Sequence, residues 1–288
     1  MLTRFSKYIE VSRPYHAIKN LIVFAPLFFT FEHELYLYLD ALIIFFLFYL
    51  MSTVVYIFND ISDRNIDKFH PRKKLRPIAS GTVSIVEAKI LMLSIFLLAT
   101  IISYFFNYQL LIVLLLYAVI NILYSLKLKE IVFIDILIIS SGFILRLLAG
   151  SLVNDIYLSK WIYIMTFLLA GLMAVTKRKD AVDRNDYTST SISRYYTKNI
   201  INYIVIIITL SIIVTYSLFT ISSEIIITLG NIYVPFTLVF VLLGVGRYLH
   251  LIYNKPISYD PVEIFFNDLF MKVNFVLWVL SFYILTKI

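Results

Sequence analysis

The chain has 288 residues, of which 61% are hydrophobic and 15% are charged, and its mean hydropathy is +0.89. Soluble globular domains of this length are far more polar, so the composition predicts an integral membrane protein. The absence of cysteine excludes disulfides, iron–sulfur clusters and thiolate metal sites. The four histidines are scattered and lack the spacing of a zinc site.

The N-terminal segment, residues 1–20, mixes charged and apolar side chains and predicts an amphipathic helix at the membrane interface. Arg13 and Pro14 are expected to end this helix. The segment fits either a simple membrane anchor or a part of a substrate site. No small-residue cleavage site follows the next apolar run, so we expect that run to remain as a membrane helix.

Nine apolar runs approach the length of about 20 residues that a helix needs to span a bilayer. They predict an all-α fold, a polytopic bundle of about nine transmembrane helices, as a single domain over residues 1–288. The runs cover residues 17–31, 41–58, 85–106, 110–124, 131–152, 161–175, 200–221, 232–248 and 273–285.

The most polar stretch of the chain, residues 59–81, follows directly on the second run. In a helix, Asn59, Asp63 and Asp67 recur every four residues with Asp60 beside them, so their oxygens share one face. Mg²⁺ prefers such oxygen ligands and usually keeps positions for water and substrate phosphate. We therefore predict that these four residues bind Mg²⁺ and that the three aspartates take part in catalysis.

A cluster of basic residues follows the acids and supplies positive charge for a polyanion. Its members are Arg72, Lys73, Lys74 and Arg76. An acidic stretch followed by a basic one is also common in plain solvated loops. The helical register of the acids, at the end of an apolar run, favours a site that holds a diphosphate through magnesium.

Two later runs carry polar side chains. Asn121 and Tyr124 fit either a helix–helix hydrogen bond with an interfacial tyrosine, or an aromatic wall beside a developing cation. Asp135 and Arg146 lie about three helical turns apart and so point the same way. Charges within a membrane usually face the bundle interior. Arg146 is therefore a candidate substrate-binding residue, with a structural ion pair as the alternative.

A second polar segment follows the sixth run and repeats the combination of basic and acidic residues. It contains Lys177, Arg178 and Lys179, then Asp180, Asp183 and Asp186. We predict that Lys177 and Arg178 help to hold a diphosphate and that Asp180 or Asp183 assists with the metal or substrate.

The net charge of +7 is distributed in a way that argues against nucleic-acid binding. With the N-terminus in the cytoplasm, every Lys and Arg except Arg146, Lys160 and Lys287 falls on the inner side, as the positive-inside rule expects. We therefore predict a bacterial inner membrane protein whose two polar segments both face the cytoplasm.

Two motifs resemble a known family. The pattern N-D-x-x-D-x-x-x-D at 59–67, with R-P-I-A-S-G at 76–81, resembles the first signature of the UbiA superfamily of intramembrane prenyltransferases. The segments H-P-R-K-K-L-R-P-I-A-S-G at 70–81 and S-G-F-I-L-R-L-L-A-G at 141–150 are similar to one branch, the decaprenyl-phosphate phosphoribosyltransferases. The resemblance covers nearly the whole chain, with its segments in order.

The resemblance also implies roles for single residues. Lys19 matches the N-terminal region of the branch and is implied to reach a phosphate, while Lys177 and Arg178 match its Lys-Arg pair. The second loop departs from the family pattern, because Tyr187 and Ala181 stand where an acid is expected. A C-terminal region also matches at Arg247, Tyr248, Asp260, Pro261, Glu263 and Asp268.

The activity that the resemblance implies is a Mg²⁺-dependent transfer of 5-phosphoribosyl from phosphoribosyl diphosphate to a polyprenyl phosphate, with release of diphosphate. The alternative enzyme would use the same magnesium site to prenylate an aromatic or quinone precursor. A lipid-linked transporter is a third possibility. Transporters often break their helices with Gly or Pro at the midplane, whereas the 7 Gly and 7 Pro here lie mostly near segment ends.

Overall fold

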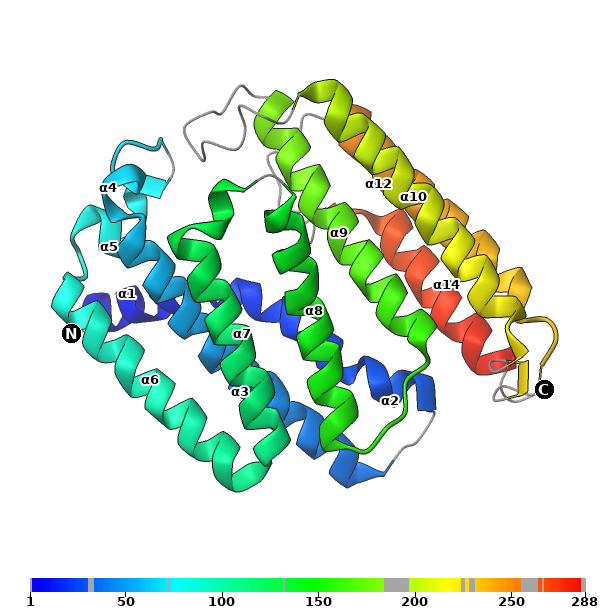
Figure 1. Cartoon of the computed structure of the whole chain (residues 1–288), viewed down its shortest axis with the longest axis horizontal. Helices are drawn as coiled ribbons and strands as arrows, with labels where there is room; N and C mark the ends of the chain where they lie inside the picture. The colour runs from blue at the N-terminus through cyan, green and yellow to red at the C-terminus, as the bar shows by residue number, and fades with distance from the viewer. Residues whose placement is uncertain are drawn as a thin grey trace. The chain divides into compact units, whose positions relative to one another are not determined.

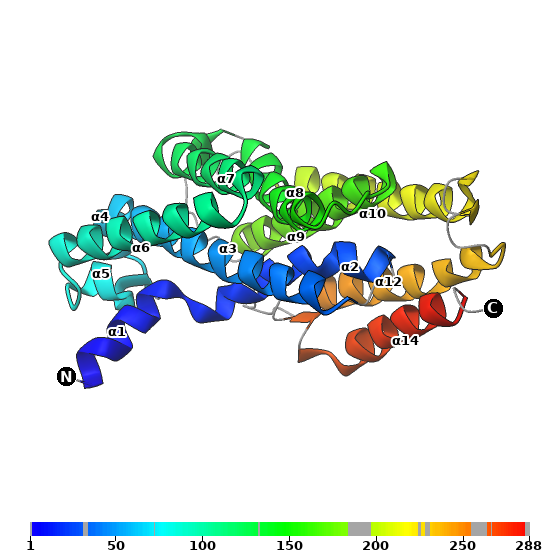
Figure 2. The ribbon, with the colours of Figure 1, turned by 90° about the horizontal axis from the view of Figure 1, so that it is seen from below.

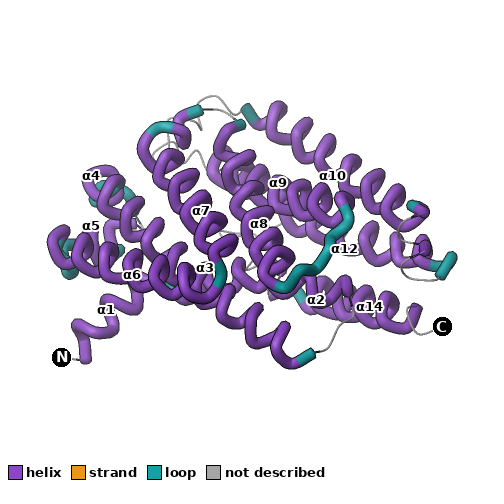
Figure 3. The backbone as a smooth tube through the Cα atoms, turned by 60° about the horizontal axis from the view of Figure 1, so that its bottom comes forward, coloured by secondary structure: helices purple, strands orange, loops and turns teal. Residues whose placement is uncertain are grey.

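The structure is a computed structural model that describes residues 2–30, 34–71, 73–131, 133–183, 197–223, 226–227, 231–254, 264–265 and 267–285. Within these ranges the regular elements are all helices, as Figures 1 and 3 show. The predicted all-α fold is confirmed. The chain forms two compact units, Met1–Leu158 and Ser159–Ile288.

The first unit is organised around α3, which contacts α6, α7, α8 and the 3₁₀ helix η1. Its elements are α1 (Leu2–Ser12), η1 (Pro14–Phe24), α2 (Ala25–Thr30), α3 (Leu35–Ser62), α4 (Arg64–Asp67), η2 (Lys73–Leu75), α5 (Pro77–Ser80), α6 (Ile85–Phe106), α7 (Tyr108–Leu126), η3 (Leu128–Glu130) and α8 (Ile134–Val153). Figure 2 shows α1 beside α5, at the end of the unit where α3 meets the short helices.

Side chains in the sequence mark several of these helix boundaries. Ser84 caps α6, because its hydroxyl accepts from the Glu87 N–H while the Glu87 carboxylate accepts from the Ser84 N–H. Asn107 caps α7 in the same sense, accepting from the Leu110 N–H at 3.0 Å. The prediction that Arg13 and Pro14 end the first helix is confirmed, since α1 stops at Ser12.

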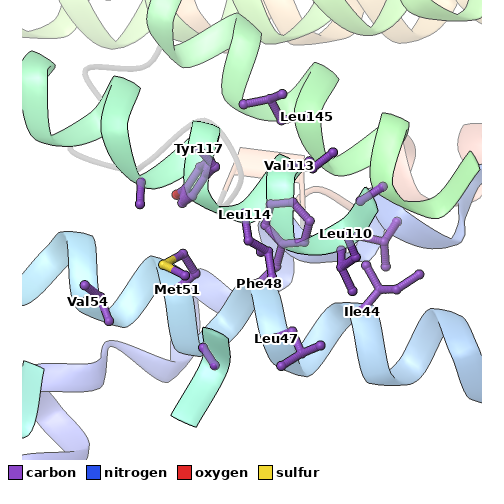
Figure 4. Close-up of a cluster of buried hydrophobic side chains, with 14 of the residues drawn as sticks. Ile44, Leu47, Phe48, Met51, Val54, Leu110, Val113, Leu114, Tyr117 and Leu145 are labelled. Atoms are coloured by element: carbon purple, nitrogen blue, oxygen red, sulfur yellow. The ribbon is translucent and has the colours of Figure 1, made fainter. Parts of the chain in front are cut away.

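The core of the first unit lies between α3 and α7. Phe48 and Met51 of α3 are fully buried, and Leu114 and Tyr117 of α7 pack against this helix (Figure 4). The Phe48 and Tyr117 rings meet edge to face with centroids 5.6 Å apart. This packing fixes the position of α3, whose C-terminal end carries the predicted acidic residues.

Where the second unit is described, it contains four long helices and one short 3₁₀ helix. They are α9 (Lys160–Asp183), α10 (Lys198–Ile221), η5 (Val234–Thr237), α12 (Leu238–Asn254) and α14 (Leu269–Leu285). α9 packs on α10, and α12 packs on α14 (Figure 1). Tyr216 joins three of these elements through hydrogen bonds with Thr237 at 2.7 Å and Trp278 at 2.8 Å.

Seven helical stretches of the described ranges are long and apolar enough to cross a membrane, from Leu35–Ser62 to Val234–Asn254. The last predicted span is the shorter apolar helix α14. The first predicted span differs in type, because residues 14–24 form a 3₁₀ helix and only Ala25–Thr30 is α-helical. The predicted bundle of about nine helices agrees with this arrangement.

Candidate functional site

The four predicted magnesium ligands lie at the C-terminal end of α3 and in the short helix after it. Asn59 and Asp60 belong to the last turn of α3, Asp63 ends that helix, and Asp67 is the last residue of α4. The Asp63 N–H donates to the Asn59 carbonyl and the Asp67 N–H to the Asp63 carbonyl, each at 2.8 Å. The predicted four-residue repeat is therefore kept, although the expected continuous helix is interrupted at Asp63.

Asp60 and Asp67 are both buried and are joined by one guanidinium. Arg76 Nη1 lies 3.0 Å from Asp60 Oδ1 and 2.7 Å from Asp67 Oδ2. Arg13 also donates to Asp60 Oδ1. Only 3% of Asp60 and 1% of Asp67 are exposed, and the basic partners offset part of the free energy that burying these side chains costs.

Two lysines complete this arrangement. Lys129, which precedes α8, forms an ion pair with Asp63, and Lys73 Nζ lies 4.0 Å from Asp67 Oδ1. We call the three aspartates and these four bases the polar cluster: Asp60, Asp63, Asp67, Arg13, Lys73, Arg76 and Lys129. It holds three negative and four positive side chains, so it suits an incoming anion better than a bare carboxylate set would.

The remaining predicted bases of this region differ in their surroundings. Lys74 is exposed and forms no ion pair with any described residue. Lys19 is half-buried on η1. Arg72 lies outside the described residues. Lys74 and Lys19 thus occupy this same unit, while their predicted contact with phosphate stays a prediction.

The four predicted magnesium ligands have suitable chemistry, but in the described part of the chain their carboxylates are not grouped around a metal position. Three carboxylates and the Asn59 amide are the hard oxygen ligands that Mg²⁺ takes, so the residue types fit the ion. The three carboxylates are paired with basic side chains, and among the described residues no group of three or more His, Asp or Glu side chains lies close enough to hold a metal. Metal binding at this site would therefore require the carboxylates to exchange their partners.

Sequence reasoning missed Arg13 and Lys129 as members of the polar cluster. The sequence places Lys129 only among the many basic residues of the inner side, and it predicts for Arg13 only the end of a helix. Arg13 has φ 49° and ψ 60°, a left-handed conformation that costs a non-glycine residue roughly 1 kcal/mol or more. Its guanidinium also lies 5.0 Å from the centre of the Tyr56 ring. Neither ion pair has a local sequence signal, because the partners lie far apart along the chain.

The polar residues predicted within the fourth and fifth runs face different surroundings. Asn121 donates to the Tyr117 carbonyl of its own helix at 2.8 Å, so the helix–helix alternative does not describe this bond. Tyr124 is half-buried in the next turn. Asp135 and Arg146 are both buried, as expected for charges that face the bundle interior. The ion-pair alternative for Arg146 is wrong within the described residues, because its hydrogen bonds all go to neutral groups.

In the second unit, the predicted basic residues occupy the last turns of α9. Lys177 is exposed and Arg178 half-buried, whereas Lys179 is buried. Lys179 forms an ion pair with Asp183, and Lys198 Nζ lies 3.8 Å from the other oxygen of Asp183. The Asp180 side chain, Asp186 and Tyr187 lie outside the described residues. Asp183 is thus flanked by two lysines in this unit.

The C-terminal region that resembled the same branch contains a clear structural pair. Arg247 Nη2 lies 2.8 Å from Asp268 Oδ2, and Asp268 Oδ1 accepts from the Met271 N–H at 3.0 Å. Tyr248 shares a 2.7 Å hydrogen bond with Thr176 of α9. Arg247, Asp268 and Tyr248 therefore join helices of the second unit, while Asp260, Pro261 and Glu263 lie outside the described residues.

Comparison with known proteins gives matches along most of the chain. The model of the UbiA prenyltransferase family matches residues 21–272, which extends over both compact units. A decaprenyl-phosphate phosphoribosyltransferase of Mycolicibacterium smegmatis is 28% identical, with 95% of this chain and 90% of that protein covered. A protein of the same name from Mycobacterium tuberculosis is 26% identical, with 75% and 74% covered.

Solved structures show the same fold. A UbiA homolog from Archaeoglobus fulgidus bound to GPP and Mg²⁺ superposes with a TM-score of 0.72 at 14% sequence identity, covering 98% of this chain and all of that one. A UbiA homolog from Aeropyrum pernix K1 gives a TM-score of 0.62 at 14% identity, covering 96% of this chain and 99% of the other. At these identities the likeness concerns the fold alone.

Proposed function

This chain belongs to the UbiA prenyltransferase family and is a membrane transferase, and on that premise we propose that it moves 5-phosphoribosyl from phosphoribosyl diphosphate to a polyprenyl phosphate. The similarity to decaprenyl-phosphate phosphoribosyltransferases over nearly the full length of both chains supports this donor and acceptor. The observation that carries the proposal within the molecule is the polar cluster, where four bases surround three carboxylates.

The proposed role of the cluster is an exchange of ionic partners. The bases that neutralise the aspartates in the described arrangement would turn to phosphate oxygens when the donor binds. Arg76 suits this step because a guanidinium presents several donors to two oxygens at once. Lys19, Lys73 and Lys74 would add charge on the same unit. Lys177, Arg178 and Asp183 would contribute from the second polar segment, as the sequence predicts.

Magnesium would be held by the aspartates freed in this exchange. The residues that fit this role are Asn59, Asp60, Asp63 and Asp67. When bound, the ion supplies charge neutralisation for the departing diphosphate. The chain's own residues then have to hold the diphosphate in one orientation and keep water away from ribose C1.

The reaction needs little covalent chemistry from the protein. The bond between ribose C1 and the diphosphate oxygen breaks, and the bonding electrons leave with the diphosphate. An oxygen of the lipid phosphate forms the new bond to C1. Because that oxygen is already anionic at neutral pH, no general base is required. We propose that Tyr124 lines the space beside C1, where an aromatic face would stabilise positive charge.

The chain's charge pattern supports an orientation with the polar segments in the cytoplasm. Both segments are rich in Lys and Arg, and the positive-inside rule assigns such segments to the inner side of the membrane. A bacterial cell membrane is the setting that we propose. The polyprenyl tail would then lie among the apolar helices within the bilayer.

Ligand protection tests the proposed donor. In the presence of Mg²⁺, phosphoribosyl diphosphate is expected to raise the thermal midpoint of the purified protein, since a ligand at 100 times its Kd stabilises by about 2.7 kcal/mol. Arg76→Ala and Lys177→Ala should shrink this effect. If geranyl diphosphate protected the protein and millimolar phosphoribosyl diphosphate did not, the aromatic prenyltransferase would be the better account.

A further inference from the structure

Within the described residues, Arg146 is a buried cation without an anionic partner. Only 5% of the residue is exposed, and it lies in the middle of α8, one of the helices apolar enough to span a membrane. Its Nε donates to Asn20 Oδ1 and its Nη1 to the Gly142 carbonyl, both at 2.7 Å. Its Nη2 donates to Ser52 Oγ and to the Tyr117 hydroxyl, both at 3.1 Å. All of these acceptors are neutral.

Aromatic rings offset part of the cost of this charge. The guanidinium carbon lies 4.7 Å from the centre of the Tyr117 ring and 5.4 Å from that of Phe48. Such contacts attract a cation but do not neutralise it. A buried charge within a membrane span usually has a counter-ion or a functional ligand. The positive charge of Arg146 is therefore not fully compensated, and a partner that compensates it must be negatively charged.

The side chain of Asn20 provides a second, independent observation that points to an anionic ligand beside Arg146. The residue is 1% exposed, and its amide nitrogen has no hydrogen-bond partner in the described part of the chain, although the oxygen of the same amide accepts from Arg146. Arg146 itself has five N–H donors and makes four hydrogen bonds, so one donor of Nη1 is also unused. The unused groups are all donors, so they call for an acceptor. A water molecule would satisfy the Asn20 nitrogen, but it would leave the charge of Arg146 uncompensated.

Arg146 and Asn20 both lie near elements that carry residues of the predicted site. Ser52, which contacts Arg146, precedes Asn59 by seven residues on α3. Seven residues are about 10 Å of helix and almost two full turns, so both residues lie on nearly the same side of α3. Asn20 follows Lys19 on η1, a 3₁₀ helix of 11 residues. Such helices rarely exceed four residues because their hydrogen bonds are weaker, so this element can readjust around a ligand more easily than an α-helix.

We infer that Arg146 and Asn20 form a subsite for a phosphate monoester, deeper along α3 than the polar cluster. The inference deepens the proposed function and rests on it, because both proposed substrates carry such a group. In phosphoribosyl diphosphate, the 5-phosphate is separated from the diphosphate by the ribose. In the acceptor, the monoester is the lipid phosphate itself. A prenyl diphosphate offers only hydrocarbon to this position.

The decisive variant is Asn20→Asp, because it supplies an internal anion without changing the size of the side chain. The carboxylate can still accept from Arg146 Nε, so the folded state should be as stable as the unchanged protein or more so. The variant removes the amide N–H donors, and its carboxylate forms an ion pair with Arg146 that competes with the ligand. We therefore expect its affinity for the monoester ligand to fall about tenfold or more, the loss of one charge-assisted hydrogen bond.

Equilibrium binding to the full chain in detergent, with Mg²⁺ present, provides the readout. The probes are phosphoribosyl diphosphate, ribose 5-phosphate, inorganic diphosphate and a short polyprenyl phosphate. Asn107→Asp is the matched control, because the same chemical change at the cap of α7 preserves the hydrogen bond from the Leu110 N–H. Ser52→Asp places an anion beside Nη2 and replaces Asn20→Asp as the test if that variant fails to fold.

The pattern of losses distinguishes the two sources of the phosphate. Weaker binding of phosphoribosyl diphosphate and ribose 5-phosphate, with unchanged binding of inorganic diphosphate, would support a subsite for the donor. Weaker binding of the polyprenyl phosphate alone would support a subsite for the acceptor. Unchanged binding of all probes would overturn the subsite, although the proposed function would stand as long as the unchanged protein bound phosphoribosyl diphosphate. If the unchanged protein bound neither substrate, both proposals would fail.

Discussion

At the scale of single residues, each aspartate of the polar cluster contacts at least one basic side chain. Arg76 bridges Asp60 and Asp67, while Lys129 holds Asp63. Buried ion pairs contribute little net stability, because the loss of hydration opposes the attraction between the charges. The ion pairs at the end of α3 therefore agree better with a site in which the bases leave the aspartates to bind a ligand than with a role in stability alone.

Asp67→Asn tests this exchange. The amide keeps the shape of the side chain but removes the charge proposed to hold magnesium, so transferase turnover should fall by about a hundredfold or more. Folding should persist, because Arg76 retains Asp60 as a partner. Asp40→Asn on the same helix is the control, since Asp40 forms no ion pair within the described residues. Near-normal turnover of Asp67→Asn at limiting Mg²⁺ would show that the ligand assignment is wrong.

The sequence predicted the carboxylates of this site but not all of their partners. The four-residue spacing of Asn59, Asp63 and Asp67 is a local signal, because neighbours on a helix face recur with the helical period. The pairs of Arg13 with Asp60 and Lys129 with Asp63 span 47 and 66 residues. Such pairs depend on how the elements pack, which no single stretch of sequence records.

At the scale of elements, helix packing in the first unit depends on a glycine. A Cβ built on Gly150 of α8 would lie 2.2 Å from the Val23 carbonyl oxygen of η1. Small residues permit such close approach between membrane helices. The contact holds η1, with Lys19 and Asn20, against the helix that carries Arg146.

Gly150→Ala should therefore destabilise the protein, whereas Gly246→Ala should not. The first change forces backbone to shift and should cost roughly 1–3 kcal/mol. Apart from the backbone of its own helix, no atom of the described residues lies within 4 Å of a Cβ at Gly246, so an alanine there only favours the helix, by about 0.5–1 kcal/mol. Thermal unfolding in detergent measures both. Equal midpoints for the two variants would contradict the close contact between α8 and η1.

The type of the long elements was predictable, but two local features were not. Hydrophobic runs of membrane-spanning length indicate helices because lipid offers the backbone no hydrogen-bond partners. The 3₁₀ helix Pro14–Phe24 and the interruption at Asp63 are built from residue types that an α-helix also contains, so the local sequence does not mark either feature. The interruption lies where the chain turns to pack α4 and α5 against α3, whereas η1 packs against α8 and α3, and the hydrophobic pattern encodes neither contact.

At the scale of the whole molecule, the account requires both polar segments on one side of the membrane. The chain has no cysteine, so single cysteines can be introduced without other changes. Cysteines at Lys74 and Lys198 should react with an impermeant reagent only from the cytoplasmic side, and one at Glu34 only from the outside. Lys198 is suitable because its side chain is 70% exposed. Labelling of positions 74 and 198 from opposite sides would contradict the proposed orientation of the two segments.

The family assignment leaves the identity of the transferred group as the central claim. The most direct measurement is a transfer assay with purified protein, Mg²⁺, labelled phosphoribosyl diphosphate and a polyprenyl phosphate, beside a second reaction with geranyl diphosphate and 4-hydroxybenzoate. Our account predicts that label moves into the lipid in the first reaction, that chelation of Mg²⁺ or Asp67→Asn stops it, and that the second reaction gives no product. A prenylated aromatic product, with no label in the lipid, would contradict it.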